Sequence, residues 1–171
     1  MTTHKFFPLL LGTSICLSPI GVKAQQPAQT DQAIEQVGEP FDGFTLATQY
    51  DKAVFTDGEP IKVSFRLKNL RTTQEAFLRT IDRQDFNLKV TTADEKPVAR
   101  TEYGRTEINT KSATTARLKQ GDELTGMLNV NRIYDMTKAG KYNITVSTRA
   151  PGSGTYVYSK TTTITVAFTS F

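Results

Sequence analysis

The chain has 171 residues, and its 21 lysines and arginines against 17 aspartates and glutamates give a formal net charge of only +4. Its single histidine, His4, and its single cysteine, Cys16, both lie within the first 24 residues. The remainder therefore contains no imidazole base, thiol nucleophile, disulfide, or histidine or cysteine metal ligand, and it has no basic block that would indicate a nucleic-acid interface.

Residues 1–24 have the layout of a secretory signal peptide. A short positive start precedes an apolar stretch over residues 6–20, and Val22-Lys23-Ala24 provides small residues at the usual cleavage spacing. A membrane anchor is the alternative, but the stretch is short for a span of about 20 apolar residues and no second one follows. We therefore expect cleavage after Ala24, export to the periplasm or the medium, and no membrane span.

Residues 25–41 are rich in glutamine and alanine and poor in apolar residues. This composition is typical of a flexible segment. A short helix over residues 31–37 would have little to pack against. We expect a flexible lead-in here, followed by one domain over residues 42–171.

From residue 44 onward, apolar residues recur at every second position, which is the period of a half-buried β-strand. The clearest run is Ile61–Leu67, where apolar residues alternate with Lys62, Ser64 and Arg66. Weaker or similar runs cover residues 44–50, 53–55, 75–80, 86–90, 116–118, 124–130, 142–148 and 156–168, with turns at residues 56–60, 93–96, 119–122 and 150–154. In the last run Lys160 falls on the apolar side, which predicts a late entry into the core or a β-bulge.

Seven to nine short, evenly spaced strands without long helical periodicity predict an all-β fold. The pattern favours an antiparallel immunoglobulin-like β-sandwich, with a closed barrel as the alternative. Residues 104–117 are mostly polar and predict a long connection.

The stretch from Asp135 to Tyr142 fits the corner of such a sandwich. In immunoglobulin-like domains, a tyrosine near the start of the sixth strand donates a hydrogen bond to the chain a few residues upstream, and Tyr142 occupies that place. Gly140 permits a tight entry turn, and Asp135 can close a side-chain turn over the next two residues. A ligand site around Asp135, Tyr142 and the neighbouring Tyr134 is the alternative.

Residues 118–146, with the pattern "Leu, turn Gly, apolar strand, Tyr-Asp, Gly-x-Tyr", resemble the last third of bacterial secreted immunoglobulin-like modules. The pattern is similar to the small sandwich-fold proteinase inhibitor family and to the non-catalytic domain of deuterolysin-type metalloproteases. Residues 58–69 resemble the second strand of such modules. The resemblance implies the fold over residues 42–168; the His-Glu-x-x-His motif of the protease itself is absent.

Few side chains remain for catalysis. Asp82 and Asp85 are spaced for a carboxylate pair or for part of a calcium site, but turn acids of this kind usually cap the backbone. Without further ligands or a base, the sequence predicts no cofactor, no metal and no enzyme activity.

Two loops remain as candidate contact surfaces, residues 70–74 and 149–155, because the corresponding loops gather at one end of an immunoglobulin-like sandwich. Arginine and tyrosine are enriched at interface hot spots. The candidate partner contacts are Arg71, Arg149, Pro151 and Tyr156. We expect a non-catalytic module that binds another protein or an envelope component, with strand addition at an exposed edge as one route. The alternatives are a proteinase inhibitor that presents residues 149–154 and, third, a carboxylate enzyme.

Overall fold

The computed structural model describes residues 33–108 and 112–168. The predicted signal peptide, residues 1–24, and the first part of the predicted lead-in lie outside these ranges. The described residues are mostly β-strand, with three single-turn helices, which confirms the predicted all-β class. Two larger sheets and one two-stranded sheet make up the fold.

The first sheet is antiparallel, with its strands in the order β1-β2-β4-β8. These strands are β1 (Ile34–Val37), β2 (Phe44–Tyr50), β4 (Lys62–Asn69) and β8 (Glu123–Asn129). Alternate residues of β2 and β4 face the core, and Phe44, Tyr50, Val63 and Leu67 are all at most 1% exposed. The period-two pattern is therefore confirmed for these two strands.

Strand β1 corrects the prediction for residues 25–41. A flexible segment, or a helix over residues 31–37, is wrong for residues 34–37, which pair with β2 from Ile34 opposite Tyr50 to Val37 opposite Ala47. The pairing rests on backbone hydrogen bonds, and an edge strand needs little apolar side-chain area for them. The composition of the segment therefore does not reveal the strand.

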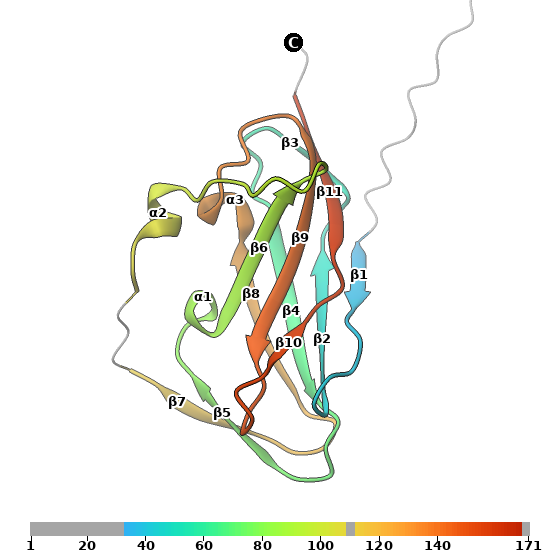
Figure 1. Cartoon of the computed structure of the whole chain (residues 1–171), viewed down its shortest axis with the longest axis vertical. Helices are drawn as coiled ribbons and strands as arrows, with labels where there is room; N and C mark the ends of the chain where they lie inside the picture. Colours follow the sequence, from blue (N-terminus) through green and yellow to red (C-terminus); the bar gives the residue numbers. More distant parts are fainter. Residues whose placement is uncertain (1–32, 109–111, 169–171) are drawn as a thin grey trace, which may run out of the picture.

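The second sheet is built around β9 (Gly140–Arg149). Strand β6 (Phe86–Thr92) pairs along one edge of β9, and β10 (Tyr156–Tyr158) and β11 (Thr162–Ala167) share the other edge. Strand β3 (Val54–Thr56) pairs with β11 in parallel, so this sheet is not antiparallel throughout as predicted. Figure 1 shows β6, β9 and β11 lying over β2, β4 and β8.

A β-bulge separates β10 from β11. Tyr158 lies opposite Ser147 and Thr162 lies opposite Ile144, so the outer strand carries one extra residue. Ser159 fills the gap, because its backbone N–H donates to the Val146 carbonyl at 2.8 Å and its Oγ accepts from the Val146 N–H at 2.9 Å. Before the bulge Val157 and Ser159 face the core, and after it Thr162 and Ile164 do. Lys160 is exposed together with Tyr156 and Tyr158, so the predicted core side is wrong for these two tyrosines, while the predicted β-bulge is present.

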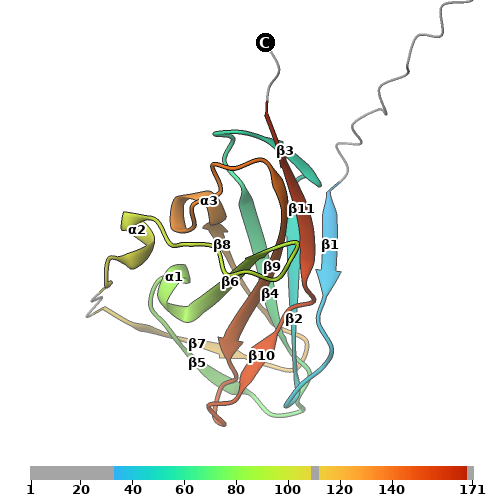
Figure 2. The same ribbon diagram turned by 45° about the horizontal axis from the view of Figure 1, so that its top comes forward.

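The remaining elements are short. They are β5 (Glu75–Arg79), α1 (Asp82–Asp85), α2 (Glu102–Arg105), β7 (Thr114–Leu118) and α3 (Val130–Ile133). Figures 1 and 2 place the helices on the side away from β1, and β5 and β7 at the end away from the C-terminus. Strand β7 corresponds to the edge strand predicted at residues 116–118. It begins two residues earlier, at Thr114, within the connection predicted for residues 104–117. None of the helices in the described ranges is long or apolar enough to cross a membrane.

The two larger sheets share one hydrophobic core. At its centre the rings of Phe65 from β4 and Phe86 from β6 lie 3.9 Å apart between centroids, and each residue is 1% exposed. Phe77 from β5 stacks on Phe86 at 6.3 Å, so the small sheet is anchored to the same core.

The segment before β9 forms a hydrogen-bonded corner. Tyr142 Oη donates to the Lys138 carbonyl at 2.6 Å. Asp135 Oδ1 accepts from the backbone N–H and the hydroxyl of Thr137, at 3.3 and 2.7 Å. Gly140 has φ +156°, a value that favours glycine. The buried Tyr142 ring and its hydroxyl bond therefore fix how the chain enters β9.

We expect Tyr142→Phe to lower the free energy of unfolding by about 1 kcal/mol, because it removes one partly buried hydrogen bond and leaves the ring in place. Urea denaturation followed by circular dichroism measures the change. The control is Tyr158→Phe, whose side chain is 56% exposed and should change nothing. Equal stability of Tyr142→Phe and the unmodified protein would show that the corner bond has no net stabilising effect.

Candidate functional site

A groove of about 580 Å³ opens at the end of the molecule where β5 faces the β9–β10 hairpin. One wall is formed by Ala76, Phe77 and Leu78 of β5, and the other by residues 149–156. This volume falls within the range of roughly 300–1,000 Å³ that is typical of ligand sites. Three of the four predicted contact residues, Arg149, Pro151 and Tyr156, line it.

The β5 wall is an open strand edge. Within the described residues β5 pairs only with β7, and no residue of β7 lines the groove. In an antiparallel pair, every second residue points its backbone N–H and C=O away from the partner strand. Leu78, which is 66% exposed, adds an apolar side chain beside this edge. The wall therefore offers backbone hydrogen-bonding groups together with apolar surface.

Arg149 and Tyr156 form a paired feature on the opposite wall. Arg149 Nε donates to Tyr156 Oη at 3.3 Å, and the guanidinium carbon lies 5.6 Å from the centre of the Tyr156 ring. The hydrogen bond to Tyr156 raises the pKa of Arg149, and an arginine side chain carries its positive charge at any physiological pH. Tyr156 remains 37% exposed. The pair thus presents a cation and an aromatic ring, which are common at interface hot spots.

Arg71 does not line the groove but braces its end. Its guanidinium pairs with Asp42 Oδ1 at 2.6 Å and with Glu75 Oε1 at 3.3 Å, and it also donates to the Pro151 carbonyl at 3.5 Å. The two predicted contact loops therefore meet through this side chain. Arg71 holds the loops together, and its donors are not directed at a partner.

Asp42 completes this brace. Hydroxyl groups of Ser153 and Thr155 and the guanidinium of Arg71 lower the pKa of Asp42 below its ordinary value of 3.8. A carboxyl whose pKa falls on folding stabilises the native state above its unfolded pKa and loses that effect as the pH falls through the folded pKa. The contribution of Asp42 is thus present above about pH 4 and disappears in stronger acid.

We therefore expect the hairpin at residues 150–155 to loosen as the pH falls below about 4, because Asp42 takes up a proton. Amide cross-peaks of these residues in nuclear magnetic resonance spectra should shift or broaden over this range. In Asp42→Asn the same cross-peaks should show their low-pH behaviour already at pH 5. An acid transition of equal size in Asp42→Asn would assign it to another group.

Two corrections concern the β9–β10 loop. Pro151 is buried although it borders the groove, and its carbonyl accepts a hydrogen bond from Arg71. The loop is also a tight turn: Gly152 and Gly154 have φ +79° and +71°, and the Ala150 N–H donates to the Thr155 carbonyl at 2.7 Å. The sequence identifies the loop correctly, but it does not show that Ala150 and Pro151 are buried.

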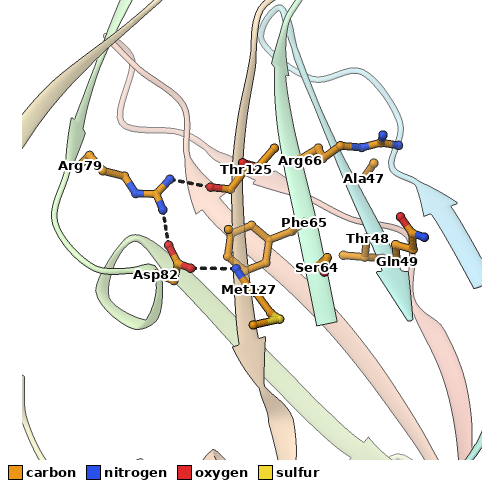
Figure 3. A pocket seen from close by; sticks show the side chains of 11 residues that line it. Ala47, Thr48, Gln49, Ser64, Phe65, Arg66, Arg79, Asp82, Thr125 and Met127 are labelled. Atoms are coloured by element: carbon orange, nitrogen blue, oxygen red, sulfur yellow. Dashed lines mark hydrogen bonds and ion pairs between the residues drawn. The ribbon is translucent and has the colours of Figure 1, made fainter. Parts of the chain in front are cut away.

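A second hollow, of about 450 Å³, lies beside β8 and is drawn in Figure 3. There Arg79 Nη1 donates to the Thr125 carbonyl at 2.9 Å, and Asp82 Oδ2 accepts from the Met127 N–H at 2.8 Å. Arg79 and Asp82 also pair with each other. The two side chains satisfy backbone groups on the outer edge of β8, which protects this edge from pairing with another chain.

The carboxylate pair singled out by the sequence is thus structural. Asp82 binds Arg79 and β8, while Asp85 accepts from the N–H and hydroxyl of Thr80, at 2.9 and 2.5 Å. Arg79 Nε also lies 3.4 Å from Asp85 Oδ2. No group of three or more His, Cys, Asp or Glu residues in the described ranges is arranged to hold a metal ion.

The corner residues Asp135, Gly140 and Tyr142 lie away from the groove, since they are at the other end of β9. Tyr142 and Arg149 are seven positions apart in β9, which is roughly 23 Å of strand. The structure therefore does not bring the two predicted groups together. The sequence did not lead us to predict that β5 forms a wall of the groove. The position of Leu78 on the outward side of an alternating strand could have indicated an exposed apolar surface there.

Comparison with known proteins completes this description. No protein-family model matches the chain, and no curated protein matches it.

Proposed function

We propose that this chain is an exported, non-catalytic immunoglobulin-like module that binds an extended segment of another protein in the groove between β5 and the β9–β10 hairpin. The observation that carries the proposal is the open edge of β5, which lies beside a cavity whose far wall presents Arg149 and Tyr156.

The order of the strands supports the immunoglobulin-like assignment. In that fold, strands A, B and E share one sheet and strands C, F and G share the other. Here β2, β4 and β8 take the places of A, B and E, and β6, β9 and β11 take those of C, F and G. The Tyr142 hydroxyl bond to the chain four residues upstream, on the strand equivalent to F, agrees with this assignment.

Export is supported by the sequence alone. The layout of residues 1–24 is that of a signal peptide, and the absence of cysteine after residue 24 is compatible with an oxidising compartment. Exported modules of this kind act on partners outside the cytoplasm, which are other secreted or envelope proteins.

The groove favours an extended segment over a folded surface. A peptide laid along β5 would pair with the outward N–H and C=O groups, and its alternate side chains would point into the cavity. Arg149 and Tyr156 would meet those side chains. The outer edge of β8 is unsuited to the same role, because Arg79 and Asp82 already occupy its backbone groups.

The absence of catalysis is supported by the chemistry of the remaining acids. Asp82 and Asp85 are both engaged with Arg79 and with backbone N–H groups, so neither carboxylate is free to act as a base or nucleophile in this arrangement. The described residues contain no histidine and no cysteine.

Proteinase inhibition by residues 149–154 is a weaker candidate. An inhibitory loop has to enter a protease cleft as an extended, exposed segment. This loop is instead a tight turn with two glycines at positive φ and with Ala150 and Pro151 buried.

The test uses a phage-displayed library of random peptides, selected on the unmodified protein and measured by isothermal titration. The matched pair of variants is Tyr156→Ala and Tyr158→Ala, since both tyrosines lie on β10, both are exposed, and only Tyr156 lines the groove. We expect Tyr156→Ala to weaken binding at least about tenfold, because a lost hot spot costs more than about 1–2 kcal/mol. Tyr158→Ala should stay within about twofold.

The proposal would be wrong if the two variants lost affinity equally, or if no peptide were enriched on the unmodified protein. If the protein instead inhibited a secreted protease tightly and stoichiometrically, and if this inhibition required Arg149, the result would support a function as a proteinase inhibitor.

A further inference from the structure

The three short helices lie on the side of the molecule away from β1 (Figures 1 and 2), and these helices and the segment before α2 carry four arginines. This arginine cluster consists of Arg83 in α1, Arg100 in the segment before α2, Arg105 in α2 and Arg132 in α3. Up to 49 positions separate its members in the chain, so no basic block is visible in the sequence. The fold alone brings them together.

Two of these arginines, Arg83 and Arg132, contact the ring of Tyr103. The guanidinium carbon of Arg83 lies 4.4 Å from the centre of the Tyr103 ring, and that of Arg132 lies 4.1 Å from it. The two cations are therefore no more than 8.5 Å apart, the sum of the two distances. Such stacking orients the planar guanidinium groups and leaves those N–H donors that make no other hydrogen bond available to a ligand.

Backbone contacts hold this arrangement in place. Arg83 Nη2 donates to the Gly104 and Thr106 carbonyls at 3.0 and 2.6 Å, and Arg105 Nη1 donates to the Arg100 carbonyl at 2.7 Å. Thr101 Oγ1 accepts from the Gly104 N–H at the start of α2 and donates to the Arg132 carbonyl. The bonds link the segments that carry the cluster and fix their spacing before any ligand arrives.

The four arginines form no salt bridge within the described residues. The ion pairs found in residues 33–108 and 112–168 involve other basic side chains, and none joins a carboxylate to one of the four arginines. Glu102 and Glu107 are close in sequence and exposed, but neither forms such a pair. Four basic side chains against the two nearby carboxylates of Glu102 and Glu107 leave a net positive charge here, and a net positive charge attracts an anion.

We propose that the arginine cluster is a binding site for a compact group with at least two negative charges, of the phosphate-ester or pyrophosphate class. Guanidinium forks match phosphate oxygens bidentately, and each charge-assisted hydrogen bond is stronger than a neutral one. The short distance between Arg83 and Arg132 suits one compact polyanionic group better than the spaced carboxylates of an acidic peptide. This site is separate from the groove and does not depend on the proposed function.

The probe is sodium tripolyphosphate, titrated into the unmodified protein by calorimetry at two salt concentrations. Arg132→Gln is the test variant, because Arg132 is exposed and its side chain stacks on Tyr103 without capping a helix. Arg117→Gln is the matched control, since Arg117 is an exposed arginine on β7 outside the cluster. We expect binding that weakens with salt, a loss of at least about tenfold in Arg132→Gln, and a change within about twofold in Arg117→Gln.

Further binding measurements distinguish a lipid headgroup from a soluble phosphate compound as the natural ligand. Vesicles of phosphatidylcholine with phosphatidic acid that bind in an Arg132-dependent way would support a lipid headgroup as the natural form, and binding of tripolyphosphate alone would support a soluble one. Equal weakening in the two variants would overturn the proposal in favour of diffuse charge. Absence of tripolyphosphate binding, or tighter binding of a poly-aspartate peptide, would overturn it as well. Tyr156→Ala should not alter tripolyphosphate binding, which separates this test from that of the groove.

Discussion

Replacing Phe86 with alanine is expected to lower the free energy of unfolding by about 3–5 kcal/mol, the range for buried aromatic residues cut back to alanine. Phe86 is 1% exposed and contacts Phe65 from the facing sheet and Phe77 from β5. Its removal would leave a cavity where the two larger sheets and the small sheet meet, and the rigid strands around it can collapse only partly.

Urea denaturation measures this effect, with Phe168→Ala as the control because Phe168 is 62% exposed. If Phe86→Ala does not fold, Phe86→Leu should still fold with a smaller loss of stability. A loss below about 1 kcal/mol in Phe86→Ala would mean that the sheets do not share the core described above.

The second large effect is expected at Asn69, a fully buried polar residue at the end of β4. Its Nδ2 donates to the carbonyls of Thr73 and Leu118 at 3.0 and 2.9 Å, and its Oδ1 accepts from the Arg71 N–H at 2.9 Å. In Asn69→Leu, a change of similar size, these three backbone groups would lose their partner. The bond to Leu118 is buried and the other two are partly buried, so we expect a loss of about 1–3 kcal/mol for the Leu118 carbonyl and a smaller further loss for the other two groups.

Thermal and urea unfolding of Asn69→Leu would be compared with Asn87→Leu, an exposed asparagine on β6. Because Asn69 ties the loop before β5 to the segment before β8, the groove should also be disordered in the folded fraction of Asn69→Leu. Stability equal to that of the control would show that water replaces the side-chain amide and that Asn69 is not the organising residue of this end.

The strands that the sequence predicts best are those with one core face and one wet face. Residues 61–67 alternate without exception, and β4 follows the same register. Lys160 likewise indicated the bulge before β11, because a charged residue on the apolar side needs a local change of register. In both cases the polar or apolar character of the side chains indicates which face of the sheet each residue occupies.

Features held by backbone pairing or by long-range contact are harder to predict. Strand β1 buries little side-chain area, so its composition resembles that of a linker. From the sequence, Pro151 is expected to be an exposed turn residue. In the structure it is buried, and its carbonyl accepts a hydrogen bond from Arg71, which is 80 positions away in the chain. The pairing of Arg83 with Arg132 through Tyr103 depends on the packing of α2 against α3, which no local pattern encodes.

One wall of the candidate groove could be predicted from the sequence, and the other could not. The sequence indicates Arg149 and Tyr156 by residue type and by their place next to a turn. The facing wall depends on β5 leaving one edge unpaired, which is a property of the whole topology. Pairing with the partner's backbone at that edge is what distinguishes strand addition from simple contact with two exposed side chains.

The most direct test of the groove is therefore an N-methyl scan of the tightest peptide selected on the unmodified protein, measured by isothermal titration. Each N-methyl group removes one backbone donor and leaves the side chains in place. Strand addition to β5 predicts that methylation at every second residue weakens binding at least about tenfold, while the intervening positions change it little. Losses that follow no alternation, or no loss at any position, would contradict the account.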